Sequence, residues 1–343
     1  MQYTNTLGSA LGLWPGTEGA RYTLINHSEN HSFRIDTADG PAFVLRVHRA
    51  GYQSRTAIGS ELDWLDAIRR DTKVKVPQAL SGKNGERVQL IPFAPDDARL
   101  AVLFAFEMGE EPSEKQDLTT LFESLGETSA RLHDHARRWT SGVKIERQKW
   151  TASNMLDANG LWGDWRLAPG VIGPVADLLH VAGEQVRQEL AEYGQGSDRF
   201  GLIHADMRLA NVLVDRDQLT VIDFDDCGFG WHLYDCAAAL SFIDTEPRAT
   251  HLQQAWIDGY RRVLDLGPEH VAMLPAMMLL RRMVLLAWIG SHSETPLAQA
   301  HAPRFAADTA ELAAAYLEGR GAGAAERRSI AAVTPQIRPT TRK

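Results

Sequence analysis

The chain has 343 residues, of which 44% are hydrophobic and 23% charged, and its formal net charge is −8. That composition is ample for one large or two moderate globular domains. An acidic chain is a poor candidate for neutralising phosphates along nucleic acid, so we expect no nucleic-acid partner. Its two cysteines, Cys227 and Cys236, argue against a disulfide framework and favour a cytoplasmic location.

No membrane partner is expected either. The N-terminal residues lack the basic region and apolar run of a signal peptide. The most apolar segment, MLPAMMLLRRMVLLAWIG, contains Arg281 and Arg282. Each arginine would cost roughly 2.5–3.5 kcal/mol at the centre of a bilayer, so the segment predicts a buried core helix. The sequence leaves the oligomeric state unknown.

Residues 1–108 are rich in predicted strands. Two apolar segments, 32–35 and 43–47, flank the turn-forming DTADGP and predict a β-hairpin. Residues 60–71 predict a helix with Ser60 as its N-cap. Further strands are expected at residues 76–80, 87–93 and 100–107. Together these segments predict a small mixed sheet with one helix.

Residues 109–318 are mostly helical in pattern. The expected helices cover residues 117–139, 171–194, 249–264, 268–291 and 302–318. The Trp-rich stretch 140–170 is predicted to be an irregular connection over the surface. Residues 319–343 are rich in Gly, Ala and Arg without an apolar period, and a disordered tail is expected there. The predicted fold class is therefore α+β, with the domains divided at residues 108/109 and 318/319.

The strongest functional signal is FGLIHADMRLANVLVDRDQLTVIDFDDCGFG, residues 200–230. Asp206 and Asn211 lie on one predicted loop with His204, and the strand LTVID ends at Asp223. A carboxylate such as Asp206 can accept the proton of an attacking hydroxyl. Carboxylate and amide oxygens are ligands that Mg²⁺ accepts. Each residue alone also suits a turn or a helix cap, but the joint spacing predicts phosphoryl transfer from a metal-bound nucleotide.

The segment HADMRLANVLVDRDQLTVIDFDD resembles the catalytic core of the aminoglycoside phosphotransferase family. That family includes antibiotic kinases, homoserine kinase-like enzymes, and choline and ethanolamine kinases. The resemblance extends less sharply over residues 20–320. It implies a bilobal protein-kinase-like fold, with a small β-rich nucleotide-binding N-terminal lobe and a larger helical C-terminal lobe.

By this resemblance Asp206 is the catalytic base, and Asn211 and Asp223 bind Mg²⁺. ATP is the expected phosphoryl donor, with GTP left open. Asp225 is expected either to assist in the metal site or to bond to nearby backbone.

Two N-terminal residues fit the same resemblance. Arg46 stands where kinases place the Lys that contacts the α- and β-phosphates, and Glu61 stands where they place its acidic partner. Arg departs from the pattern, because its planar guanidinium binds phosphate with a different geometry. The alternatives are a solvent-facing strand residue for Arg46, and a first-turn residue favoured by the helix dipole for Glu61.

The remaining nucleotide contacts are less specific. No G-x-G-x-x-G loop is present, and NHSENHSF takes its place. There Asn26, Ser28 and Asn30 are expected to present donors to phosphates. Glu107 and Met108, followed by Gly109, resemble the hinge between lobes, where main-chain groups would pair with adenine.

Other polar residues favour structural roles. His133–Asp134–His135 looks like a metal cluster, but residues at i and i+2 of a helix do not share a face. The resemblance instead places this helix beneath the catalytic loop. Both cysteines are expected to be buried thiols, and Asp235 an acceptor for loop backbone or for His204.

The acceptor is expected to be a small hydroxylated molecule. Ala205 follows His204 where a protein kinase has Arg, and LYDCAAAL begins too soon after Asp223 to leave room for an activation segment. Aminoglycosides, amino alcohols, homoserine-like amino acids and sugars all remain open. The pocket is expected from helices after residue 245, with four candidate wall residues: Trp231, Trp288, His292 and Glu294. The alternatives are a Ser/Thr protein kinase of the same fold and a non-catalytic nucleotide-binding regulator.

Overall fold

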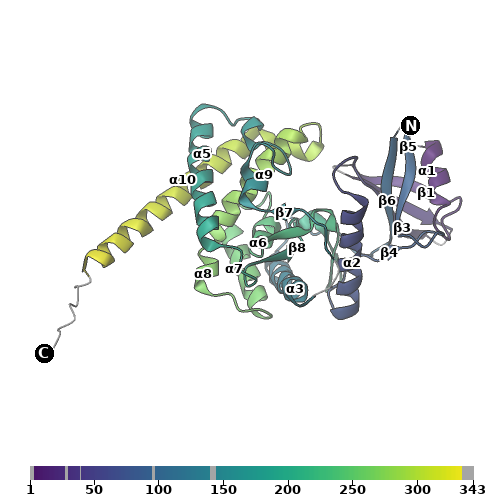
Figure 1. Cartoon of the computed structure of the whole chain (residues 1–343), viewed down its shortest axis with the longest axis horizontal. Helices are drawn as coiled ribbons and strands as arrows, with labels where there is room; N and C mark the ends of the chain where they lie inside the picture. Colours follow the sequence, from purple (N-terminus) through teal and green to yellow (C-terminus); the bar gives the residue numbers. More distant parts are fainter. Residues whose placement is uncertain (1–3, 28–29, 39, 95–96, 140–143, 334–343) are drawn as a thin grey trace. The chain divides into compact units, whose positions relative to one another are not determined.

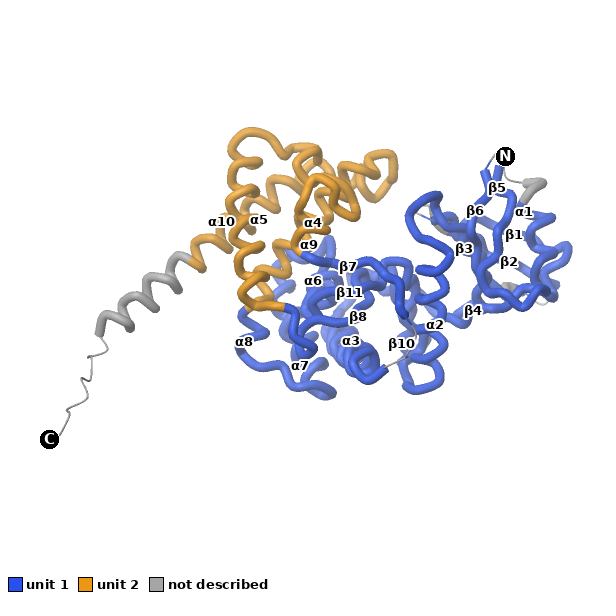
Figure 2. The backbone as a smooth tube through the Cα atoms, in the orientation of Figure 1, with its two compact units in different colours: residues 1–151, 195–272 blue, residues 152–194, 273–343 orange. Residues whose placement is uncertain are grey.

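The computed structural model describes residues 4–27, 30–38, 40–94, 97–139 and 144–333. Figure 2 shows two compact units, one of residues 1–151 with 195–272 and the other of residues 152–194 with 273–343. The N-terminal strands and the central motif thus belong to one unit. The lobe boundary at residue 108 stays a prediction. Ser28, of the expected phosphate loop, lies outside the described residues.

An antiparallel sheet forms the N-terminal part of the first unit (Figure 1). Its strands are β1 (Arg21–His27), β2 (His31–Thr37), β3 (Gly40–Val47), β4 (Ala79–Leu80), β5 (Val88–Ala94) and β6 (Asp97–Ala105). They run in the order β1-β2-β3-β6-β4, and β5 also pairs with β6. The predicted hairpin is β2–β3, in which Phe33 lies opposite Leu45.

The two faces of this sheet have different roles because successive side chains of a strand alternate in direction. On β3, Leu45 and Val47 join the core that Leu7, Leu11 and Trp14 complete from α1 (Thr4–Leu11) and the turn after it. Arg46, between them in sequence, therefore points to the other face. The sequence analysis did not anticipate α1.

Helix α2 (Arg55–Asp71) begins five residues before the predicted start. Ser54 is the N-cap, and its hydroxyl accepts from the Ala57 N–H at 3.0 Å. The assignment of Ser60 as the cap is therefore wrong. Ser60 lies in the second turn, where its hydroxyl accepts from the Glu146 N–H at 3.0 Å.

Two helices pack closely in the rest of the first unit. These are α3 (Thr119–Arg138) and α7 (Ala249–Arg261). A Cβ at Gly126 would lie 1.9 Å from the Trp256 carbonyl oxygen, and one at Gly259 would lie 1.9 Å from the Glu123 carbonyl oxygen. Both positions therefore need glycine.

Short elements surround the central motif. The strands are β7 (Lys149–Trp150), β8 (Phe200–Ile203), β9 (Val212–Asp215), β10 (Gln218–Val221) and β11 (Gly228–Trp231), and the helices are α6 (Tyr234–Ala239) and α8 (Pro268–Val271). Strand β11 lies between β7 and β8, while β9 and β10 form a separate hairpin. The loops between these strands carry Asp206, Asn211 and Asp223.

The second unit is helical, with α4 (Ala152–Leu156), α5 (Gly173–Tyr193), α9 (Leu274–Ser291) and α10 (Pro296–Val333). Helix α9 is the predicted core helix: Arg281 and Arg282 are both buried. Arg282 donates to the Thr309 hydroxyl at 2.9 Å and to the Phe305 carbonyl at 3.2 Å. Among the described residues, Pro268–Ser291 alone is long and apolar enough to cross a membrane, yet 89% of its apolar window is buried inside the protein.

One expectation for an irregular segment is corrected. In the Trp-rich stretch, Trp150, Trp162 and Trp165 are buried, so this stretch packs into the protein and does not merely cross its surface. Helix α10 extends beyond the predicted helix of residues 302–318 at both ends, and the disordered tail expected over residues 319–343 stays a prediction. Residues 334–343 lie outside the described part.

Candidate active site

Asp206 and Asn211 lie side by side on the loop after β8. The Asn211 amide donates to the Asp206 carboxylate at 2.7 Å and to the Asp206 carbonyl at 2.8 Å. Since the amide nitrogen faces two acceptors, the Asn211 side-chain oxygen must point the other way. Arg208 Nε also lies 3.5 Å from the same carboxylate oxygen of Asp206. The pair thus fixes one carboxylate and one outward amide oxygen, while the roles of base and metal ligand stay predictions.

Asp235 fixes the main chain of this loop. Its carboxylate accepts from the N–H groups of Ala205, at 2.7 Å, and His204, at 3.2 Å. Ala205 has φ 68°, a left-handed conformation that is costly for a residue with a side chain. The His133 ring lies 2.9 Å from the same carboxylate. Asp235 is therefore the predicted acceptor for loop backbone, and His133 packs beneath the loop.

The imidazole of His204 links the two halves of the motif. Its Nδ1 accepts from the Asp206 N–H at 3.2 Å, so its Nε2 carries the proton and donates to the Ile222 carbonyl at 3.1 Å. These two bonds fix the position of the ring between the two halves of the motif. The Asn211 carbonyl accepts from the Ile222 N–H at 2.9 Å. These bonds set the spacing between Asn211 and the residue after Ile222, Asp223.

Asp223 has the free surface that a metal ligand requires. Its side chain is 44% exposed, and its φ of 60° is left-handed. Although part of its side chain reaches the surface, the surrounding protein displaces water from the carboxylate, and this desolvation, together with the carboxylates of Asp225, Glu61 and Asp206, outweighs Arg46 and raises the pKa of Asp223. This crowding of negative charge fits a cation. Among described residues, no three His, Cys, Asp or Glu side chains form a metal site. One carboxylate and one amide oxygen suit Mg²⁺, which takes its other ligands from phosphates and water.

Arg46 forms the predicted pair with Glu61. Its Nη2 lies 2.6 Å from Glu61 Oε1 and its Nη1 lies 3.5 Å from Asp223 Oδ1. Its guanidinium also stacks 5.0 Å from the Phe104 ring centroid. Burial disfavours the charged form, but Glu61, Asp225 and Asp223 outweigh it and raise the pKa of Arg46. Arg46 is thus not a solvent-facing residue, and Glu61 is not in the first turn of α2.

Asp225 contacts two side chains of the N-terminal sheet region, Asn30 and His48. The Asn30 amide donates to its Oδ2 at 2.9 Å, and His48 Nδ1 lies 3.3 Å from its Oδ1. Burial would raise the pKa of Asp225, but His48, Arg46 and Arg147 hold it below its usual range. The side-chain oxygen of Asn30 accepts from the Arg49 N–H at 3.1 Å. The Asn30 side chain is therefore committed to these partners, and its contact with phosphate stays a prediction for the main chain alone.

The predicted hinge follows β6. Met108 is 67% exposed. After it, Glu110 and Val214 exchange two main-chain hydrogen bonds, at 3.0 and 2.9 Å. Gly109 has φ 135°, and a Cβ there would lie 3.0 Å from Leu213 Cβ, so the chain needs glycine at this turn. The pairing of Glu107 and Met108 with a base stays a prediction.

Several other predictions concern residues outside this centre. Cys227 and Cys236 are free and buried, as expected. Trp231 is buried in the first unit, with its ring 5.4 Å from that of Phe200. In the second unit the rings of Trp288 and His292 stack at 5.2 Å. Glu294 is exposed. Their part in an acceptor pocket stays a prediction.

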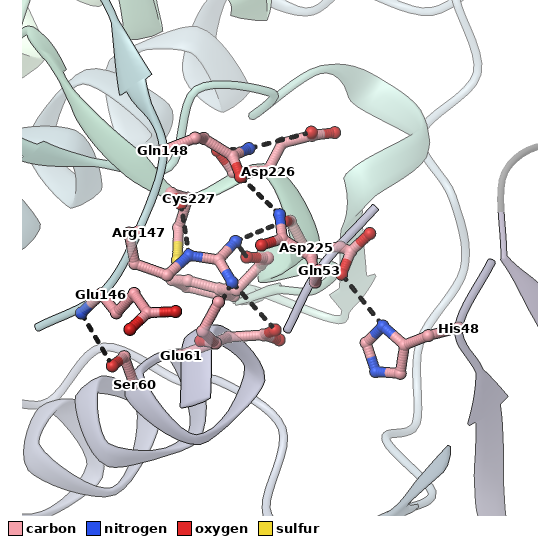
Figure 3. A network of polar contacts seen from close by, with 12 residues as sticks. His48, Gln53, Ser60, Glu61, Glu146, Arg147, Gln148, Asp225, Asp226 and Cys227 are labelled. Atoms are coloured by element: carbon pink, nitrogen blue, oxygen red, sulfur yellow. Dashed lines mark hydrogen bonds and ion pairs between the residues drawn. The ribbon is translucent and has the colours of Figure 1, made fainter. Parts of the chain in front are cut away.

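Sequence reasoning missed His48 and Arg147. Both are buried residues whose polar partners are far away in the sequence. Figure 3 shows Arg147 between Glu61 of α2 and the loop of Asp225 and Cys227. Neither residue lies in a periodic or motif-like pattern that would single it out.

The fold and this site define a protein-kinase-like phosphotransferase. A model of the phosphotransferase enzyme family matches residues 21–273, and the chain belongs to this family. It is therefore an enzyme that transfers phosphoryl groups to hydroxyls of small molecules, as the resemblance implied.

Three relatives illustrate the likeness. The solved structure of a microcompartment-associated aminopropanol kinase is 40% identical, covers 92% of this chain and 98% of its own, and has a TM-score of 0.84. Amicoumacin kinase of Bacillus subtilis (strain 168) is 23% identical over 268 residues, 75% of this chain and 76% of that protein. The solved amicoumacin kinase hAmiN, in complex with AMP-PNP, Ca²⁺ and Ami, is 21% identical with a TM-score of 0.70 and covers 89% of this chain and 92% of its own.

Proposed function

We propose that this enzyme transfers the γ-phosphoryl group of ATP, with Mg²⁺, to the hydroxyl of a small amino alcohol. The observation that carries the choice of acceptor is the 40% identity with an aminopropanol kinase over nearly the whole of both chains. The observation that carries the reaction is the Asn211 amide bonded to Asp206 at 2.7 Å. It fixes a carboxylate next to an amide oxygen that is turned outward.

Asp206 acts as the base in this proposal. The hydroxyl of the acceptor donates to the Asp206 carboxylate, and its oxygen attacks the γ-phosphorus while the bond to the β–γ bridging oxygen breaks. The hydroxyl proton passes to Asp206, and ADP leaves with the bond electrons. The loop bonds to Asp235 and Asn211 keep the carboxylate in place, so that little reorganisation is needed.

The other residues bind the nucleotide. Asn211 and Asp223 would hold Mg²⁺, which when bound neutralises the charge on the phosphates. Arg46, held by Glu61 at 2.6 Å, would pair with the α- and β-phosphates in place of a lysine. Glu107 and Met108 would present main-chain groups to the adenine base.

A panel of matched acceptors tests the proposal. ATP consumption is measured with 1-amino-2-propanol, ethanolamine, 2-propanol, isopropylamine, homoserine, a sugar and an aminoglycoside. We expect turnover with the amino alcohols and none with 2-propanol or isopropylamine, which lack the amine and the hydroxyl respectively. Efficient turnover only with the aminoglycoside or homoserine would reject the amino alcohol as acceptor.

A further inference from the structure

A short segment holds the loop that follows Asp223. The carbonyls of four consecutive residues, Phe224 to Cys227, all accept hydrogen bonds from side chains of residues 147–150, which we call the 147–150 cradle (Figure 3). Gln148 and Trp150 donate to the Asp226 carbonyl at 3.1 and 2.9 Å. Arg147 donates to the carbonyls of the other three residues.

Arg147 uses a buried guanidinium for this purpose. It donates to the carbonyls of Cys227 at 2.7 Å and Phe224 at 3.4 Å, and to that of Asp225. It also donates to the Ala57 carbonyl of α2 at 3.2 Å. Burial opposes its charge, but nearby groups that include the carboxylates of Glu61 and Asp225 outweigh that effect and raise the pKa of Arg147. A permanently charged group with this many main-chain partners connects α2 to the loop.

Glu61 lies between two arginines. Its Oε1 pairs with Arg46 at 2.6 Å, while its Oε2 is buried without a hydrogen bond, 4.0 Å from Arg147 Nη1. A buried carboxylate needs such compensation, because an uncompensated charge in the interior is strongly destabilising. Arg147 therefore affects Arg46, the arginine proposed to meet the phosphates, by compensating the charge of Glu61. It affects Asp223 by holding the loop that follows it.

Gly228 allows the 147–150 cradle to lie close to the loop. A Cβ at Gly228 would lie 2.5 Å from the Gln148 carbonyl oxygen and 3.1 Å from Trp150 Nε1. Asp223 itself is held at a left-handed φ of 60°, a conformation that persists only where the surroundings impose it. The 147–150 cradle holds the main chain of the four residues that follow Asp223.

We propose that Arg147 is a positioning residue for phosphoryl transfer. It sets the main chain after Asp223 so that this carboxylate meets the divalent cation, and it keeps Glu61 against Arg46. The inference rests on the proposed function, since it assigns Arg147 to the metal and phosphate side of that site. Lysine cannot replace it fully, because one ammonium group cannot reach four carbonyls.

The test compares Arg147→Lys and Arg147→Met with the wild-type enzyme. Binding of AMP-PNP is measured by calorimetry at graded Mg²⁺ concentrations, and hydrogen exchange is followed in peptides covering residues 222–231. Loss of a group bonded directly to a metal ligand typically weakens metal binding roughly 10- to 100-fold, and this range is the upper bound for Arg147, which holds the residues after Asp223. We expect a shift of at most that size for Arg147→Met, a smaller one for Arg147→Lys, and faster exchange in residues 222–231 for both. The KM for the acceptor should not change.

Arg282→Lys is the matched control, because Arg282 is also a buried arginine bonded to a hydroxyl and a carbonyl, in the second unit. It should lower the thermal midpoint without moving the Mg²⁺ dependence. If Arg147→Met does not fold, Gln148→Leu removes one cradle donor and should give the same shifts in smaller size. Folded variants with wild-type Mg²⁺ dependence and wild-type exchange would overturn the proposal.

Nucleotide binding, measured separately from phosphoryl transfer, distinguishes the failure of this proposal from the failure of the proposed function. A wild-type protein that binds Mg²⁺ with AMP-PNP but phosphorylates no acceptor rejects the proposed function, and the calorimetry still decides the role of Arg147. A wild-type protein that binds no nucleotide rejects both.

Discussion

The side-chain amide of Asn211 donates to the carboxylate of Asp206 at 2.7 Å. This bond places the proposed base and a proposed metal ligand in one rigid pair. Asn211→Ala should therefore weaken metal-dependent nucleotide binding and also slow transfer, because Asp206 loses a partner that orients it. We expect a higher Mg²⁺ requirement together with a lower kcat, measured by steady-state kinetics at several Mg²⁺ concentrations. A change in the KM of the acceptor alone would show that Asn211 acts elsewhere.

Arg46 and Glu61 should be strongly coupled. Their side chains are 7% and 0% exposed, and removing one member of a buried pair typically costs about 3–5 kcal/mol. Arg46→Met should thus lower the free energy of unfolding by that order. The double variant Arg46→Met/Glu61→Leu should recover much of the stability but not the affinity for ATP. Urea unfolding and calorimetry measure the two effects, and additive losses of stability would contradict the coupling.

Asp235 should be essential to the catalytic loop. Asp235→Ala leaves the N–H groups of Ala205 and His204 without their acceptor and His133 without its partner. Because each unsatisfied buried donor costs about 1–3 kcal/mol, the loss in unfolding free energy should be several kcal/mol, with a fall in kcat. Asp134→Ala, next to His133 on α3, is the control.

That control has a different environment. Asp134 pairs with Arg137 at 3.0 Å on a partly exposed surface, where such pairs contribute at most about 1 kcal/mol. Thermal unfolding of the two variants should therefore differ clearly. Equal losses would show that Asp235 does not hold the loop.

The two cysteines should be unreactive in the folded enzyme. Burial raises the pKa of Cys227 to about 12, and it also raises the pKa of Cys236. A thiol reagent should label neither in buffer and both in denaturant. Rapid labelling of the native protein at neutral pH would contradict this burial.

The raised pKa of Cys227 makes the free energy of unfolding depend on pH. The unfolded state loses its thiol protons near pH 8.5, whereas the folded state keeps them. The folded state therefore binds more protons above pH 8.5, and stability should fall as pH rises from there toward 12. Cys227→Ala should reduce the slope, as measured by urea unfolding at pH 8, 9 and 10. An unchanged slope would reject the contribution of Cys227.

The sequence predicted the parts of the site that a local motif carries. Asp206, Asn211 and Asp223 are spaced by one loop and one hairpin, so their grouping follows from the chain itself. The pairing of Arg46 with Glu61 was also predicted, although Ser60 as the N-cap of the helix that carries Glu61 was wrong. Ser54 is an equally good cap residue, and local preferences alone do not choose between them.

The sequence did not predict partners that are distant along the chain. Arg147 lies 77–80 residues from the carbonyls of the loop that it holds, inside a stretch without any apolar period. Tertiary packing alone brings it there, and the same packing buries the tryptophans that looked like a surface connection. Asn30 was expected to contact phosphate, but its side-chain amide donates a hydrogen bond to Asp225, 195 residues away in the sequence.

The central claim is most directly tested by transfer of radiolabel from [γ-³²P]ATP to 1-amino-2-propanol, in wild-type enzyme and in Asp206→Asn. Asparagine keeps the size of the side chain and an acceptor for the Asn211 amide but removes the base. Since a general base contributes roughly 10²–10⁴-fold, we expect labelled product from the wild type and a loss of that order in the variant, with nucleotide binding unchanged. Label on protein with none on the amino alcohol, or wild-type transfer by Asp206→Asn, would contradict the account.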